Sequence, residues 1–252
     1  MKLLIIGTGK MAEAIIAGAI KYHDIEVVGR DSHKIEVLIS KFPTLQSAGI
    51  LKGDFDISNK NMILCVKPYA LESVSQFLKG EANALISVLA GTTLSSLKNT
   101  IAAKYYVRAM PNLAASYQKS MTTLHGDSAF KTESIEICES FGKALWLGSE
   151  KEIDIATAVA GSGPAFLALI AEALGDGAVK EGLKREDATL LVRGLFEGFS
   201  PLLSEKHPAI IKDEVMSPGG TTAAGYAALE EGSVRDGMIK AIEKAYKRAQ
   251  GK

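Results

Sequence analysis

Through residues 1–149, short runs of β-prone apolar residues alternate with stretches whose apolar positions recur at helical spacing. The apolar runs predict strands at residues 3–6, 25–28, 61–66, 85–89, 105–109, 122–124 and 144–147. An amphipathic helix follows the first run, and another is predicted at residues 133–141. Strands that alternate with helices in this way predict an α/β fold with a doubly wound, Rossmann-like sheet.

The pattern changes near residues 148–152, where the β-branched runs stop and alanine, leucine and glutamate take over. From there, helical spacing predicts helices at residues 154–160, 165–180, 186–203, 209–215 and 233–249. We interpret Gly161-Ser162-Gly163-Pro164 as a junction between the first two of these helices. Because a chain of 252 residues suits two domains, we predict a Rossmann-like domain at 1–149 and an all-helical domain at 150–252.

The helix predicted from Ala165 is apolar on nearly every side as far as Ala173. Such a helix must be covered all round, and a domain of this size has little material to cover it alone. We therefore predict that it packs in a subunit interface, with the core of a bundle inside one subunit as the alternative. The apolar run is shorter than the roughly 20 residues of a membrane span and contains Glu172, so we expect no membrane partner.

Charge and composition narrow the function classes. Lysine plus arginine equals aspartate plus glutamate at 29 each, so no net charge attracts nucleic acid or an anionic membrane. The chain begins with Met1-Lys2 and an apolar strand at once, without a signal-peptide pattern, and we expect a cytoplasmic protein. Cys65 and Cys138 stand apart in apolar or helical surroundings, which predicts buried free thiols. The four histidines are scattered without ligand spacing, so no metal site is expected.

The first predicted strand ends in a glycine turn that opens a helix, Gly7-Thr8-Gly9-Lys10-Met11-Ala12. This G-x-G-x-x-A pattern, between a strand and a helix, is typical of dinucleotide-binding domains. One glycine makes the turn, the next lets a pyrophosphate reach the backbone, and the small third position packs the helix on the strand. We predict that these six residues bind a nicotinamide cofactor.

The second predicted strand ends about 20 residues further on, where such domains bind the ribose. Arg30 with Ser32 could hold the 2′-phosphate of NADPH, with Lys34 as a further cation, so NADPH is the expected cofactor and NADH the alternative. Asp31 leaves two interpretations open: it caps the next helix, or it approaches the ribose itself.

Later strand ends are expected to line the same edge of the sheet. One strand runs into Val66-Lys67-Pro68, where proline stops it, and the next into Ala90-Gly91, whose small residues permit close approach to a ligand. We include these five residues in the predicted cofactor site. Thr93 is a plausible cap for the helix beyond.

Ser217-Pro218-Gly219-Gly220-Thr221-Thr222 places a rigid turn, two glycines and two hydroxyls directly before a helical pattern. Glycines let backbone N–H groups approach a ligand, and the start of a helix offers unpaired donors and the positive end of its dipole. We interpret the stretch as the seat of a small anionic substrate. An ordinary Pro-Gly turn is the alternative.

Four separated motifs together resemble those of pyrroline-5-carboxylate reductases. They are Gly7-Thr8-Gly9-Lys10-Met11-Ala12, Val66-Lys67-Pro68, Gly161-Ser162-Gly163-Pro164-Ala165-Phe166 and Val215-Met216-Ser217-Pro218-Gly219-Gly220-Thr221-Thr222. The first two occur across many cofactor domains, whereas the last two, in this order, are specific to that family's helical half. The resemblance implies a Rossmann-like domain followed by a helical dimerisation domain. It also implies reduction of 1-pyrroline-5-carboxylate to L-proline with NADPH or NADH, the last step of proline biosynthesis. The implied assembly is a homodimer, in some members a decamer built from dimers.

The chemistry of reducing a cyclic imine agrees with these residues. The cofactor carries the hydride, so the protein mainly has to position and desolvate the substrate. Backbone donors from Gly219 through Gly220 to Thr222, with the Ser217 and Thr221 hydroxyls, are expected to hold the carboxylate. Thr222, the catalytic candidate, is expected to hydrogen-bond the ring nitrogen; its hydroxyl is too weak an acid to be the ultimate proton source. Glu205 is either a nearby functional carboxylate or a solvated charge at a helix end.

Two departures from the family pattern lie in one loop. Leu113-Ala114 stands where the family usually has threonine and proline, and Ser120 where a glycine is common. They bear on cofactor affinity or loop geometry more than on the reaction. Two alternatives stay open: another imine or β-hydroxyacid reductase of the same plan, or a cofactor-sensing module without turnover, which the altered loop alone supports. A β-hydroxyacid dehydrogenase would carry a catalytic lysine within its first long helix, whereas Lys180 lies at the far end of that helix.

Overall fold

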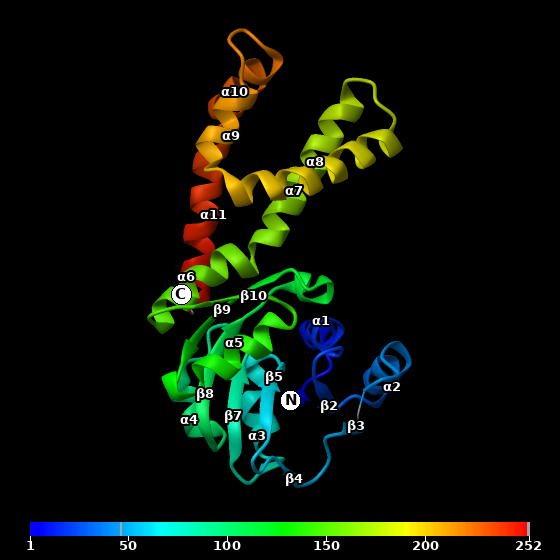
Figure 1. Ribbon diagram of the computed structural model, residues 1–252, viewed down its shortest axis with the longest axis vertical. Helices are drawn as coiled ribbons and strands as arrows, with labels where there is room; N and C mark the ends of the chain where they lie inside the picture. Colours follow the sequence, from blue (N-terminus) through cyan, green and yellow to red (C-terminus); the bar gives the residue numbers. More distant parts are fainter. Residues whose placement is uncertain (46, 251–252) are drawn as a thin grey trace. The chain divides into compact units, whose positions relative to one another are not determined.

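The computed structural model describes residues 1–45 and 47–250 (Figure 1). The chain divides into two compact units: Met1–Ser162 with the chain end from Ala245, and Gly163–Lys244. The first unit extends beyond residue 149 because the helix α6 (Glu150–Ala156) packs on the sheet with Ile153 fully buried. The domain limits 1–149 and 150–252 therefore differ from the compact units and stay a prediction.

An eight-stranded sheet forms the first unit, in the order β10-β9-β8-β7-β5-β1-β2-β3. Its strands are β1 (Lys2–Ile6), β2 (Asp24–Gly29), β3 (Ser47–Ile50), β5 (Asn61–Leu64), β7 (Ala82–Ser87), β8 (Ala103–Met110), β9 (Ser120–Gly126) and β10 (Gly142–Trp146). Neighbours are parallel except β8 and β9, which are antiparallel. A two-stranded parallel sheet joins β4 (Phe55–Asp56) and β6 (Leu78–Lys79). The predicted α/β fold is confirmed.

Helices cover both faces of the sheet because successive strand residues point to opposite sides. Leu3 and Ile5 of β1 belong to the core beneath α1 (Lys10–Ala19), α2 (Ser32–Lys41) and α5 (Lys131–Glu139). Leu4 and Ile6 belong to the core beneath α3 (Leu71–Ser75) and α4 (Leu94–Thr100). Residues buried on both faces explain why the central strands are continuous apolar runs.

The second unit is helical, as predicted. It contains α7 (Gly163–Lys180), α8 (Arg185–Glu205), α9 (Pro208–Val215), α10 (Thr221–Glu231) and most of α11 (Val234–Ala249), whose end counts with the first unit. The predicted junction at Gly161-Ser162-Gly163-Pro164 is a π-helical turn at Thr157–Gly161 that joins α6 to α7, so the chain stays helical from Glu150 to Lys180 instead of being interrupted.

The apolar helix α7 is poorly covered within this chain. Gly175 is its one buried residue, while Leu167, Leu169 and Leu174 are 50%, 65% and 45% exposed. By length and composition alone, the 31-residue stretch Glu150–Lys180 is apolar enough to cross a membrane, with 11% of its most apolar window buried. This exposure supports the predicted subunit interface more than a bundle core within one subunit.

Candidate functional site

The glycine turn after β1 is held by three strands. Gly7 has φ of +124°, and a Cβ added there would lie 2.6 Å from the backbone oxygen of Cys65, directly after β5. The Gly7 N–H also donates to the Val28 oxygen of β2 at 2.8 Å. Only glycine combines this backbone conformation with this contact, so residue 7 fixes the turn against its neighbours.

Gly9 leaves the start of α1 open. It is the N-cap of α1 with extended backbone, and among the described residues no side chain caps the helix. A Cβ added at Gly9 would have no neighbour within 4 Å. The first turn of α1 thus presents unpaired N–H groups and the positive end of the helix dipole to an empty space, which suits a phosphate.

A cleft of about 380 Å³ lies beside this turn. It is lined by Ile6, Gly7, Thr8, Gly9, Gly29, Arg30, Asp31, Lys34, Leu51, Cys65, Val66, Lys67, Tyr69, Ala70 and Val74. Most of these residues follow the carboxyl ends of β1, β2 and β5, where the chain order of the sheet changes direction at β1. Ligands of open α/β sheets bind at such a switch point.

Charged residues stand at the β2 side of the cleft. Arg30 is exposed, with Nη1 3.4 Å from Ser73 Oγ, and Lys34 lines the cleft too. Asp31 caps α2: its Oδ1 accepts from the Lys34 N–H at 3.1 Å, and this bond, more than any other interaction, lowers the pKa of the carboxyl. Of the two interpretations of Asp31, the structure shows the cap. Ser32 is exposed and lies outside the residues that line the cleft.

The other predicted cofactor residues divide into three groups. Ala12 is fully buried and Met11 packs against the core, so both hold α1 on the sheet, while Lys10 is exposed and pairs with Glu13 at 3.2 Å. Val66 and Lys67 line the cleft. Pro68, Ala90 and Gly91 line a neighbouring hollow of about 580 Å³, together with Thr157, Ser162, Ala245, Arg248, Ala249 and Gln250.

Sequence reasoning missed part of the cleft wall. Leu51 follows β3, an edge strand with no clear apolar pattern, and Val74 lies on the short helix α3. Tyr69 follows the predicted Lys67-Pro68 directly, and this adjacency was the available signal. Burial raises the pKa of the Cys65 thiol to about 12, so Cys65 serves as wall rather than as a nucleophile.

The predicted substrate loop joins α9 to α10. Gly219 has φ of +71°, and the Gly220 N–H donates to the Ser217 oxygen at 3.1 Å, which closes a tight turn. Gly220 is the N-cap of α10, and no described side chain caps this helix. Ser217 and Thr221 are exposed and Thr222 is half-buried, so free N–H groups and hydroxyls occur together at the start of an 11-residue helix.

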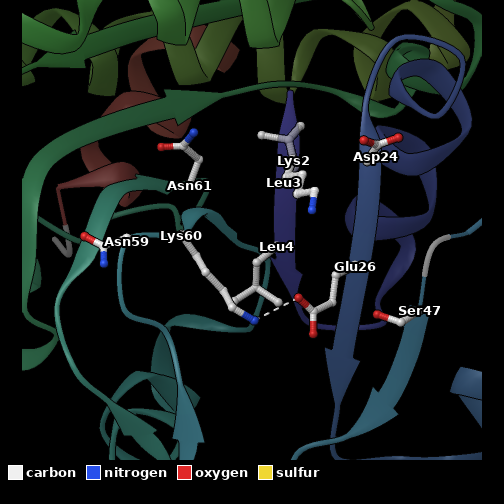
Figure 2. A pocket seen from close by; sticks show the side chains of 9 residues that line it. All are labelled: Lys2, Leu3, Leu4, Asp24, Glu26, Ser47, Asn59, Lys60 and Asn61. Carbon is white, nitrogen blue, oxygen red and sulfur yellow. Dashed lines mark hydrogen bonds and ion pairs between the residues drawn. The ribbon is translucent and has the colours of Figure 1, made fainter.

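A polar pocket of about 340 Å³ lies at the amino-terminal edge of the same sheet. Figure 2 shows Glu26 and Lys60 paired across it, 2.9 Å apart, with Lys2 and Asp24 at the starts of β1 and β2. The ends of β1 and β2 that carry the glycine turn and Arg30 lie at the opposite edge. This pocket is therefore separate from the candidate cofactor cleft.

No group of three or more potential metal ligands occurs among the described residues. Cys65 and Cys138 are both free and buried. Glu205 and Lys180 are exposed at the ends of α8 and α7, as expected for solvated charges.

Two family models match this chain. Residues 150–252 match pyrroline-5-carboxylate reductase dimerisation, and residues 2–91 match NADP oxidoreductase, coenzyme F420-dependent. A pyrroline-5-carboxylate reductase of Helicobacter pylori is 33% identical, with 98% of each chain covered. The one from Synechocystis is 35% identical and covers 99% of this chain and 97% of its own.

Solved structures agree with these sequence matches. The 1-pyrroline-5-carboxylate reductase of Streptococcus pyogenes is 29% identical with a TM-score of 0.84, covering 100% of this chain and 99% of its own. The pyrroline carboxylate reductase of Plasmodium falciparum, with NADP bound, is 25% identical with a TM-score of 0.82 and the same coverage.

We expect Gly9→Ala to weaken NADPH binding at least tenfold, about 1.4 kcal/mol, because the methyl group would occupy the space beside the free N–H groups of α1. The melting temperature should hardly change, since φ of −83° is ordinary and no atom lies near the new Cβ. Fluorescence titration and calorimetry measure the two effects. Gly49→Ala, at another open glycine outside the cleft, is the control. Unchanged affinity in Gly9→Ala, or equal losses in both variants, would contradict the assignment.

Proposed function

Because the chain belongs to the pyrroline-5-carboxylate reductase family, we propose that it reduces 1-pyrroline-5-carboxylate to L-proline, the last step of proline biosynthesis. Hydride adds to the carbon of the C=N bond and a proton to the nitrogen. The observation that carries the proposal is the uncapped start of α1 beside a cleft at the switch point, in a chain that also has the family's dimerisation domain.

We assign the cleft to NADPH, which supplies the hydride when bound. Gly7, Thr8 and Gly9, with the N–H groups of α1, suit the pyrophosphate. Arg30 and Lys34 suit a 2′-phosphate, because both side chains line the β2 side of the cleft. Asp31 is engaged as a helix cap and also pairs with Lys34 Nζ at 3.4 Å. Ser32 stays a prediction as a ribose-side contact. NADH lacks the 2′-phosphate and is the second cofactor to be tested.

The remaining predicted cofactor residues fall into three groups. Val66 and Lys67 form the β5 side of the cleft. Pro68, Ala90 and Gly91 line the neighbouring hollow, where small residues leave room for the nicotinamide end. Lys10, Met11 and Ala12 contribute through the backbone and packing of α1.

We assign the substrate carboxylate to the loop before α10. The backbone N–H groups from Gly219 to Thr222 and the hydroxyls of Ser217 and Thr221 are donors, and the dipole of α10 favours an anion there. The Thr222 hydroxyl is assigned to the ring nitrogen, which it orients as a hydrogen-bond partner. Its acidity is too low for it to be the final proton source, so the proton comes from water or arrives on the imine. Positioning and exclusion of water then supply most of the protein's contribution.

The helical unit makes the protein an oligomer. Its residues match a dimerisation domain, and the poorly covered face of α7 has counterparts on α8, where Leu190, Leu191 and Leu195 are exposed. A second copy of the chain covers these residues in a homodimer. We propose further that five such dimers assemble into a decamer, and that the enzyme works in the cytoplasm without a nucleic-acid or membrane partner.

We expect the purified protein to oxidise NADPH in the presence of pyrroline-5-carboxylate and to form proline, which initial rates and amino-acid analysis measure. A 2-ketoacid should give no rate, because a keto oxygen, unlike an imine nitrogen, does not arrive protonated and the loop before α10 provides no acid for it. NADPH binding without imine-dependent turnover would contradict the reductase and favour a sensing module. Turnover with a β-hydroxyacid would indicate the other reductase class.

Arg30→Ala is expected to raise the KM for NADPH at least tenfold while that for NADH changes less than twofold, because only NADPH carries the 2′-phosphate. Steady-state kinetics with each cofactor measures the difference. Lys41→Ala is the charge-matched control, since Lys41 lies on the neighbouring helix and pairs with Glu13. An equal effect of Arg30→Ala on both cofactors would exclude the 2′-phosphate assignment.

Thr222→Ala should lower kcat at least tenfold, about 1.4 kcal/mol of barrier, through loss of the hydroxyl at the ring nitrogen. Thr222→Ser keeps the hydroxyl and should retain most of the activity. Because Thr222 is only half-buried, both variants are expected to fold, which circular dichroism checks. A kcat for Thr222→Ala close to that of the unmodified enzyme would remove Thr222 from the mechanism.

A further inference from the structure

An ion cluster around a buried arginine joins β8 to the start of α6. Arg108 is 2% exposed; its Nη1 donates to Glu150 Oε1 at 3.0 Å and its Nη2 to Asp154 Oδ1 at 2.8 Å. Its neighbours Val107 and Ala109 point into the core on the other face of the sheet. A buried guanidinium is stable only when carboxylates pair with it. The two ion pairs of Arg108 therefore hold the first turns of α6 in place.

The same carboxylate reaches a third element. Glu150 Oε1 also accepts from the Leu94 N–H at 2.8 Å, and Leu94 is the first residue of α4. The segment directly before α4 contains Ala90 and Gly91, which line the hollow assigned to the nicotinamide end. Arg108 therefore fixes α6 and, through Glu150, the end of this loop.

The other end of the helical connection is held by Asn112. This residue is 9% exposed, and its Nδ2 donates to the Ala160 oxygen at 2.9 Å. Its Oδ1 accepts from the Ala114 N–H at 3.0 Å, and its own N–H donates to Ser120 Oγ at 3.1 Å. The amide is thus engaged on both sides, and Ser120, a departure from the family pattern, supports it.

The sequence explains why the Ala160 oxygen is available. Its α-helical partner would be the N–H of residue 164, which is proline and has none. In the π-helical turn the Ser162 N–H donates to the oxygen five residues earlier, that of Thr157, at 3.1 Å. Asn112 satisfies the carbonyl that Pro164 leaves without its helical donor. Single π turns of this kind are frequent at functional sites.

We propose that Arg108 and Asn112 are positioning residues that clamp residues 150–161 at both ends. They fix where the chain leaves the cofactor unit, at Ser162, and hold the hollow assigned to the nicotinamide end. This inference rests on the proposed function. The clamp acts on the chemical step rather than on cofactor affinity, because its partners lie outside the cleft that contains Gly9 and Arg30. Small displacements of reacting groups are costly, since hydride transfer needs close alignment.

The first test is Asn112→Asp. The new carboxyl group is isosteric and still accepts from the Ala114 N–H, but when ionised it cannot donate to Ala160. We expect kcat to fall at least tenfold while the Kd for NADPH stays within twofold. Gln118→Glu is the matched control: Gln118 Nε2 also donates to backbone oxygens, those of Gly18 and Ser140, away from the clamp.

The second test compares two glutamates of α6. Glu150→Ala removes the acceptor shared by Arg108 and Leu94, and kcat is expected to fall at least fivefold with unchanged NADPH affinity. Glu152→Ala, two residues away, removes only a bond to the Gly148 N–H and should leave kcat within twofold.

Hydrogen exchange across residues 157–164 should increase in Asn112→Asp and not in Gln118→Glu.

These readouts separate the clamp from the proposed function. Exchange is measured without substrate, so unchanged protection in Asn112→Asp overturns the clamp whatever the enzyme reduces. Equal kcat losses in the test and control variants would contradict a positioning role for Arg108 and Asn112. So would an NADPH affinity that falls together with kcat. Absence of imine turnover in the unmodified protein would overturn the proposed function alone.

Discussion

The close contact between Gly7 and the backbone of Cys65 is the constraint on which the candidate cofactor site depends. With φ of +124° and no room for a side chain, the turn brings β1 against β5 and aims the start of α1 at the cleft. Gly9 then keeps the space in front of the helix empty. The two glycines serve different physical purposes: one allows protein to pack on protein, the other allows a ligand to approach.

The helical unit has a different constraint: it exposes more apolar surface than one chain can cover. Leu169 and Leu190 are each about two-thirds exposed, at 65% and 66%, and few residues of this unit are buried at all. Such a surface is stable in water only when another copy covers it. The loop assigned to the substrate belongs to the same unit as the uncovered leucines.

The sequence predicted what depends on local pattern. The strands around Ile5 and Ile63 are continuous apolar runs, so they need no distant information. The Asp31 cap is also local, and it was one of the two interpretations that the sequence left open. Features that depend on residues far apart were not predictable. Arg108 looked like an ordinary strand residue, because its partners lie 42 and 46 positions away. The edge strand β3 has a pattern too weak to predict, and Pro164 suggested a helix break where a π turn carries the helix on.

The most direct test of the account is the path of the transferred hydrogen. With NADPH deuterated at the transferable position of the nicotinamide, the proline formed from pyrroline-5-carboxylate should carry one deuterium, at C5, which mass spectrometry and NMR locate. Deuterium at that carbon would establish hydride transfer from the cofactor to the imine. Unlabelled proline, or deuterium released to water, would contradict direct transfer and with it the joint assignment of the cleft and the anion seat.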